Sequence, residues 1–165
     1  MKRFFGQQPT MDETSKERLD RELNELLQGL RIAIPGVQFM YAFLLTVPFA
    51  QGFARVTEFQ KDVFLVALIS TALSSVCFIA PAVQHRLLFR GGAKDVLLRR
   101  SNRYGIAGAL ALAVAMTSAI LLVVDYLFGR SWALSVAIPL SALILWVWLL
   151  QPVITRFRRA GDPLP

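Results

Sequence analysis

The sequence predicts an all-α fold: an integral membrane four-helix bundle that follows an N-terminal cytoplasmic amphipathic helix. The chain has 165 residues, of which 55% are hydrophobic and 18% charged, whereas about a quarter of a typical soluble domain is charged. No charged residue lies in four windows of 21 to 25 residues, at 32–54, 63–84, 104–124 and 131–155. A hydrocarbon core about 30 Å thick needs roughly 20 apolar residues in a helix, so each window is long enough to cross it.

Other fold classes fit the four windows poorly. Core helices of a soluble protein need a polar stripe that faces water, and these windows have no charge to provide one. Strands of a membrane β-barrel alternate polar and apolar residues, whereas stretches such as 119–124 are continuously apolar. In lipid the backbone must satisfy its own hydrogen bonds, which favours helices.

The first part of the chain is predicted to stay outside the four-helix domain. We expect residues 1–13 to be a flexible lead and residues 14–31 to form an amphipathic interfacial helix that begins with a capping box from Thr14 to Glu17. Leucines recur at helical spacing on one face, at Leu19, Leu23, Leu26, Leu27 and Leu30. This helix either lies at the interface, packed on the bundle, or serves as a docking or oligomerisation helix.

The four-helix domain is predicted to cover residues 32–155, and residues 156–165 form a basic cytoplasmic tail. Prolines predict distortions within the spans: a bend at Pro35, and kinks at Pro48 and Pro139. Between the second and third spans, a turn at Gly91-Gly92 predicts a helical hairpin whose ends extend beyond the apolar windows. Small residues spaced four apart in these two spans predict close helix packing.

Lysine and arginine predict the orientation of the spans. Of the 18 Lys and Arg residues, 15 lie in the N-terminal segment, the second loop and the C-terminal tail. By the positive-inside rule these segments are cytoplasmic, which predicts a multi-pass protein of the bacterial plasma (inner) membrane. The arginines are expected to meet anionic lipid headgroups. They lack the interleaved aromatic residues that stack on bases, so no nucleic-acid partner is expected despite a net charge of +7.

The composition argues against enzymatic chemistry. The chain has one histidine and one cysteine, too few for the common zinc, iron–sulfur or disulfide frameworks within one chain. It contains no P-loop, dinucleotide fingerprint, zinc-protease motif or nucleophile elbow. We therefore expect no catalytic residue, no cofactor and no metal.

The remaining candidates are polar residues within the windows or at their edges: Gln38, Tyr41, Gln51, His85, Arg86 and Asp125. Gln38 and Tyr41 fall on one helical face, so they either pack between helices or line a cavity. Asp125 is expected to be a solvated end cap near Arg130, and in the alternative it acts in ion transfer. His85 is expected to be structural or lipid-facing, with a pH-sensing role as the alternative.

Three stretches resemble a known family: 21–38 (RELNELLQGLRIAIPGVQ), 59–63 (FQKDV) and 80–90 (APAVQHRLLFR). Together they are similar to a family of small four-span membrane proteins of unknown function, found mostly in actinobacteria. The resemblance covers about residues 15–155. Members are sometimes labelled sodium:proton antiporters. The family usually has an acidic residue where this chain has Gly29, and it brings no established site residues.

Two functions are expected from these observations. The first is a non-enzymatic structural or interaction component that self-associates, with the N-terminal helix as a surface for a protein partner. The second is a small oligomeric ion or proton transporter or channel subunit of the antiporter kind. Such exchange requires an ionisable group at membrane depth, and the four windows contain none. A membrane enzyme acting on lipids through His85 and its neighbouring arginines ranks third.

Overall fold

The computed structural model describes residues 15–88 and 94–160. The expected lead at 1–13, the Thr14 cap, the Gly91-Gly92 turn and the end of the basic tail lie outside these residues. The described part is all-α, without a strand. Its elements in chain order are α1 (Ser15–Thr46), the 3₁₀ turns η1 (Val47–Phe49) and η2 (Gln51–Arg55), α2 (Glu58–Leu88), α3 (Lys94–Phe128), α4 (Arg130–Leu145), the π-helical stretch η3 (Trp146–Leu150) and α5 (Gln151–Ala160).

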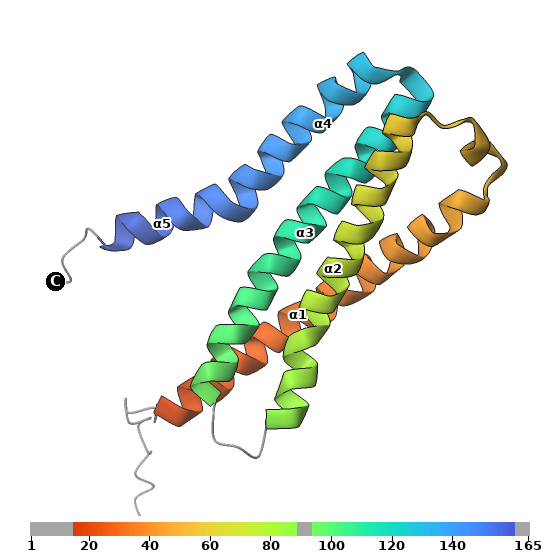
Figure 1. Ribbon diagram of the computed structural model, residues 1–165. Helices are drawn as coiled ribbons and strands as arrows, with labels where there is room; N and C mark the ends of the chain where they lie inside the picture. The colour runs from red at the N-terminus through yellow and green to blue at the C-terminus, as the bar shows by residue number, and fades with distance from the viewer. Residues whose placement is uncertain (1–14, 89–93, 161–165) are drawn as a thin grey trace, which may run out of the picture.

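The central feature is the antiparallel pair of α2 and α3 (Figure 1). Helix α1 packs against both of these helices, whereas α4 packs against α3 and, within the described residues, against neither α1 nor α2. The two connections that join α1 to α2 and α3 to α4 lie at one end of the molecule, which we call the Asp125 end (Figure 1). The opposite end, where α2 approaches α3, is called the arginine-rich end.

The bounds of α2 and α3 match the predicted helical hairpin. Helix α2 runs past its apolar window to Leu88, and α3 begins at Lys94, ten residues before its window. The extended ends therefore carry arginines on helices rather than on a long loop.

The α2–α3 contact is built on small residues. Ala67, Thr71 and Ser74 of α2 are completely buried. The Ser74 hydroxyl donates a 2.8 Å hydrogen bond to the Gly108 carbonyl on α3. A Cβ at Gly108 would lie 2.6 Å from two carbons of the Phe78 ring. This close approach requires glycine at position 108, as the small-residue spacing predicts.

A second packing region lies towards the Asp125 end, where α1 joins the α2–α3 pair. Its buried side chains come from all three helices: Leu44, Val63, Phe64, Ala67 and Leu122. The segment after α1 is held onto this region because the rings of Phe53 and Phe64 meet edge to face, with centroids 5.3 Å apart.

Helix α1 differs from the sequence expectation in two ways. The amphipathic segment and the first apolar window form one helix, which continues through Pro35. At Pro48 the helix does not kink: it ends at Thr46, and Pro48 lies in η1. Proline cannot donate to the preceding turn and disfavours helical geometry at the residue before it, so the chain continues as two 3₁₀ turns instead.

The fourth apolar segment also changes its hydrogen bonding near a proline. The π-helical stretch η3 directly precedes α5, and Pro152 is the second residue of α5. Pro152 has no N–H for the Trp148 carbonyl, and its ring crowds that group. The wider π turn relieves this crowding, while Pro139 is contained within α4.

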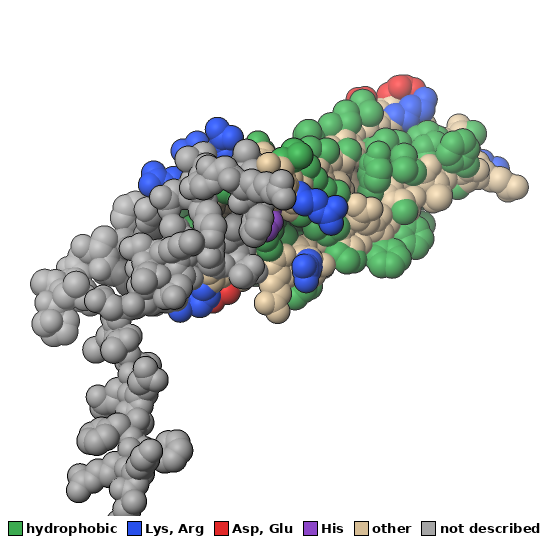
Figure 2. Space-filling model, turned by 90° about the horizontal axis from the view of Figure 1, so that it is seen from below, with side chains coloured by type: hydrophobic (Ala, Val, Ile, Leu, Met, Phe, Trp, Pro, Cys, Tyr) green, Lys and Arg blue, Asp and Glu red, His purple; other side chains and the backbone are tan. Residues whose placement is uncertain are grey.

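Four helical segments are long and apolar enough to cross a membrane: Glu25–Phe49, Glu58–Leu87, Leu97–Phe128 and Arg130–Thr155. Each overlaps one predicted window. Their outward side chains are largely apolar, including Phe43 at 71% and Trp132 at 65% exposure. Figure 2 shows this hydrophobic surface between charged groups at the two ends of the molecule.

Candidate functional site

The most organised polar group of the described chain lies at the Asp125 end, where three helices meet. Gln60 comes from the first turn of α2, Asp125 from the last turn of α3 and Arg130 from the start of α4. The Gln60 amide (Nε2) donates to Asp125 Oδ2 at 2.8 Å, and Arg130 Nε donates to Asp125 Oδ1 at 2.7 Å. We call these three residues the Asp125 clasp.

Gln60 is positioned by a capping box at the start of α2. The Thr57 backbone N–H donates to Gln60 Oε1 at 3.0 Å, and the Gln60 N–H donates to Thr57 Oγ1 at 3.3 Å. This reciprocal pair satisfies backbone donors that a helix start leaves free. Because Gln60 Oε1 accepts from Thr57, its NH₂ group is the one that faces Asp125.

Arg130 is brought to Asp125 by a tight connection between α3 and α4. Only Gly129 separates the two helices, with φ 87° and ψ 173°, a conformation that is essentially restricted to glycine. The Gly129 N–H donates to the Asp125 carbonyl at 3.0 Å. The chain thus reverses within one residue, and the Arg130 side chain turns back onto the last turn of α3.

The clasp combines a buried carboxylate with a partly exposed cation. Asp125 is 8% exposed, whereas the Arg130 side chain is 47% exposed. The Arg130 guanidinium also lies over the Phe59 ring, 3.3 Å from its centroid, a cation–π arrangement. The expected neighbour Arg130 is therefore correct, but the expectation of a solvated Asp125 is wrong, because Gln60 and the helix ends cover the carboxylate.

Both carboxylate oxygens of Asp125 have a hydrogen-bond donor, which limits the chemistry of the clasp. Each oxygen keeps a second lone pair, but the two donors fix the carboxylate between α2 and α4. Within residues 15–88 and 94–160, no group of three or more His, Cys, Asp or Glu side chains could hold a metal ion. The arrangement is that of a structural link between α2, α3 and α4.

The structure does not bring the six sequence-predicted residues together. His85 and Arg86 lie in the last turn of α2 at the arginine-rich end, with His85 half-buried and Arg86 exposed. Gln51 is exposed in η2, and Asp125 lies in the clasp.

The prediction that Gln38 and Tyr41 both face inward is wrong for Gln38. Helix α1 directs Val37 and Leu44, which lie seven residues apart, towards its neighbours. Gln38 follows Val37 by about 100° around the helix and is exposed, while Tyr41 is half-buried. These two residues therefore do not line a common polar cavity.

Gln60, which is not among the residues predicted from the sequence, completes the clasp. Its signal in the sequence is Thr57-Glu58-Phe59-Gln60, a capping box directly before an apolar run.

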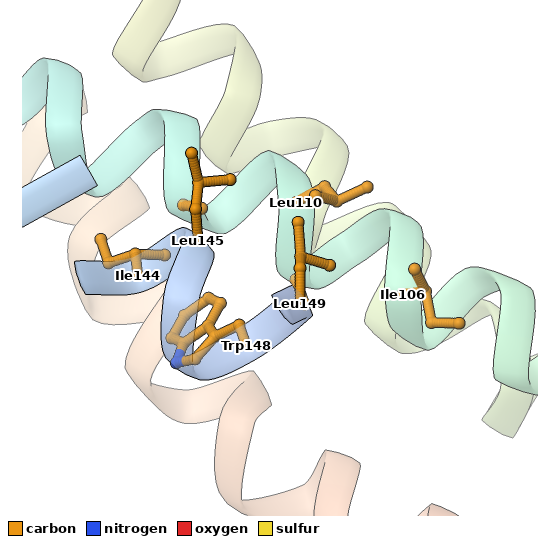
Figure 3. A pocket seen from close by; sticks show the side chains of 8 residues that line it. Ile106, Leu110, Ile144, Leu145, Trp148 and Leu149 are labelled. Carbon is orange, nitrogen blue, oxygen red and sulfur yellow. The ribbon is translucent and has the colours of Figure 1, made fainter. Parts of the chain in front are cut away.

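A second feature is an apolar pocket between α3 and the α4–η3 stretch. It has a volume of about 70 Å³, and all eight lining residues are apolar, among them Ile106, Ile144 and Trp148 (Figure 3). An adjoining pocket of about 220 Å³ adds Thr117, Ser118 and Ser141. Neither pocket is lined by a titratable side chain.

A comparison with models of protein families finds a match. The model of a family described as "Family of unknown function (DUF6328)" matches residues 12–152. No curated protein and no solved structure matches the chain.

Proposed function

Because the chain belongs to the DUF6328 family, whose function is unknown, we propose its role from the geometry of its own residues. It is a multi-pass integral protein of the bacterial plasma membrane, and it acts as a non-enzymatic structural or interaction component that self-associates. The proposal fits the actinobacterial four-span proteins that the sequence resembles.

The observation that carries this proposal is the position of α4, which has α3 as its only helical neighbour among the described residues besides its own continuation. The buried side of α4 contains Ala133, Ala137 and Ile144. Its opposite side is exposed and carries small residues at helical spacing: Ser131, Ser135 and Ala142. In lipid, helices associate through close packing of small residues, so this open side suits α4 of a second copy.

Substitution on the open side of α4 tests self-association. We expect Ala142→Trp to weaken the oligomer because the indole holds the two helices apart. Ala82→Trp is the matched control, since Ala82 is exposed on α2 and not on α4. The measurement is photobleaching-step counting of a fluorescently tagged chain in dilute lipid vesicles. Single steps for the unsubstituted protein, or equal step numbers for both variants, would contradict the proposal.

The charge distribution supports cytoplasmic termini and contact with anionic headgroups. Exposed arginines lie on the α2 and α3 extensions of the arginine-rich end, at Arg86, Arg99, Arg100 and Arg103, and a further one, Arg31, lies near the middle of α1. Each lies within a turn or two of an apolar segment, where positive-inside selection acts. Protease protection of tags at both termini in intact cells tests the orientation, and cleavage of either tag from outside would reverse it.

The first part of α1 is a second candidate contact surface. Leu26, Leu27 and Leu30 are half-buried, whereas Glu25 and Gln28 on the other side are exposed. This pattern supports a helix that packs through its leucines and offers a polar side to a protein partner. Replacing both Glu25 and Gln28 with lysine is expected to release a co-purifying partner without changing the membrane fraction of the chain.

Ion or proton exchange of the sodium:proton antiporter kind is the alternative function. Within the part of the chain that the structure describes, the feature that favours it is a buried carboxylate, Asp125. Because Gln60 and Arg130 occupy both oxygens of this carboxylate, we rank exchange second.

A further inference from the structure

An elongated groove lined by uncharged residues lies at the Asp125 end of the molecule. It lies between α3 and the segment that links α1 to α2, and its volume is about 290 Å³. Leu44 and Val47 line one side, and residues from Ala119 to Leu127 of α3 line the other. That stretch of α3 is about 12 Å long, so the groove runs along the helix rather than across it.

The lining of the groove is apolar except near its end. Phe53, Val56 and Leu122 form part of the wall. The Tyr126 hydroxyl lies close to Gly52, because a Cβ added at Gly52 would be 2.8 Å from the Tyr126 oxygen. An elongated apolar groove with one polar group at its end fits a hydrocarbon chain attached to a polar headgroup.

The wall formed by η2 is fixed by packing. Phe53 lines the groove and also meets the Phe64 ring of α2 edge to face, with an interplanar angle of 71°. Two 3₁₀ turns, which follow from Pro48, direct this segment back towards α3. Packing against α2 therefore holds the Phe53 side of the groove in place.

Arg55 provides the second, independent observation. Three cations lie at the Asp125 end: Arg55, Lys61 and Arg130. Lys61 pairs with Glu58 and Arg130 pairs with Asp125, both at 2.7 Å. No carboxylate of the described chain pairs with Arg55, which is exposed and directly precedes the lining residue Val56. Three carboxylates, Glu58, Asp62 and Asp125, lie at the same end, so the end has no net charge. Arg55 is a cation without an ion-pair partner in the described chain, and it adjoins the groove wall in sequence.

We propose that this groove binds an acyl chain of an acidic phospholipid, whose headgroup phosphate pairs with Arg55. The apolar wall accounts for the chain, and Arg55 accounts for the preference for a negative headgroup, since guanidinium groups bind phosphate through charge-assisted hydrogen bonds. The proposal rests on the membrane insertion proposed above.

The test uses the full-length protein in phosphatidylcholine vesicles that contain phosphatidylglycerol with a photoreactive diazirine on its acyl chain. Flotation first establishes that each variant is in the vesicles, and mass spectrometry then locates the labelled peptides. We expect labelling at Ala119–Leu127, competed by unlabelled phosphatidylglycerol more strongly than by phosphatidylcholine. Failure to float would contradict membrane insertion, whereas flotation without groove labelling would overturn the lipid site alone.

Two substitutions and their controls separate the two parts of the site. Ala119→Phe is expected to abolish groove labelling because the ring fills the deep end, while Ala42→Phe, exposed on the far side of α1, leaves labelling intact. Arg55→Gln is expected to weaken phosphatidylglycerol competition about fivefold, the loss that corresponds to one basic residue near an anionic headgroup. Lys61→Gln is the control, because Lys61 is already paired.

Three results would overturn the proposal. The first is groove labelling that Ala119→Phe leaves unchanged. The second is equal competition by the two phospholipids in the protein with Arg55. The third is a crosslink between two chains in place of the lipid label, which would assign the groove to a second copy.

Discussion

The Gln60 side-chain amide donates a 2.8 Å hydrogen bond to the Asp125 carboxylate, which joins the first turn of α2 to the last turn of α3. Both partners are buried, at 7% and 8% exposure. The same amide closes the capping box of α2 through its oxygen. One side chain therefore fixes both the start of a helix and its register against the next helix.

Removal of the Gln60 amide should destabilise the fold measurably. We expect Gln60→Ala to lower the free energy of unfolding by about 1–3 kcal/mol, because a buried carboxylate loses one of its two donors. Unfolding in mixed micelles, followed by circular dichroism, provides the measurement. Glu58→Ala is the control: it breaks an exposed pair with Lys61, which is worth at most about 1 kcal/mol. A smaller loss for Gln60→Ala than for Glu58→Ala would show that the clasp is not a structural link.

Gly129 should resist any substitution. Its φ of 87° and ψ of 173° are accessible at low cost only to glycine, so Gly129→Ala is expected to cost about 1–3 kcal/mol and to displace Arg130 from Asp125. The midpoint of thermal unfolding in detergent provides the measurement. Gly29→Ala, at a helical position with no atom within 4 Å of the added Cβ, should be neutral or stabilising. Equal effects of the two alanines would contradict the assigned turn.

The α2–α3 contact predicts that alanine substitution has different effects on stability at two glycines of α3. Gly108→Ala places a Cβ 2.6 Å from the Phe78 ring, and we expect a loss of about 1–3 kcal/mol from this overpacking. Gly105→Ala, three residues earlier on α3, meets no atom within 4 Å and should be tolerated. Combining Gly108→Ala with Phe78→Leu should recover part of the lost stability. If the double variant is no more stable than Gly108→Ala alone, the ring is not what limits this position.

The helices were predictable because the signal for them is local. A run of 21 to 25 residues without charge can be recognised as a membrane span without knowledge of the rest of the chain. The close packing at Gly108 is likewise predicted by the spacing of its small neighbours. Helical spacing did not reveal which side of α1 faces inward, because apolar residues surround the helix. The hydrophobic effect distinguishes inside from outside in water, but it does not do so in lipid. Gln38 was therefore placed on the wrong side.

The clasp was harder to predict from the sequence because its members are far apart along the chain. Gln60 and Asp125 are separated by 65 positions, and no local pattern shows that they meet. The burial of Asp125 further depends on the backbone conformation of Gly129, which directs Arg130 back over α3. The capping box from Thr57 to Gln60 was readable, and it would have identified Gln60 as a fixed side chain but not its partner.

The two hydrogen bonds that the Asp125 carboxylate accepts lead to a prediction about transport. Because Gln60 and Arg130 hold both oxygens of this carboxylate, we expect vesicles with the purified protein to keep imposed Na⁺, K⁺ and H⁺ gradients as long as protein-free vesicles do. Fluorescent indicators for the three ions inside the vesicles provide the measurement, and a known ionophore added at the end verifies that each gradient was present. The contrary result is dissipation of a gradient by the unsubstituted protein. Asp62 is an exposed carboxylate at the same end and serves as the control. If the dissipation disappears in Asp125→Asn but persists in Asp62→Asn, ion transfer is assigned to Asp125 and the exchanger becomes the first-ranked function.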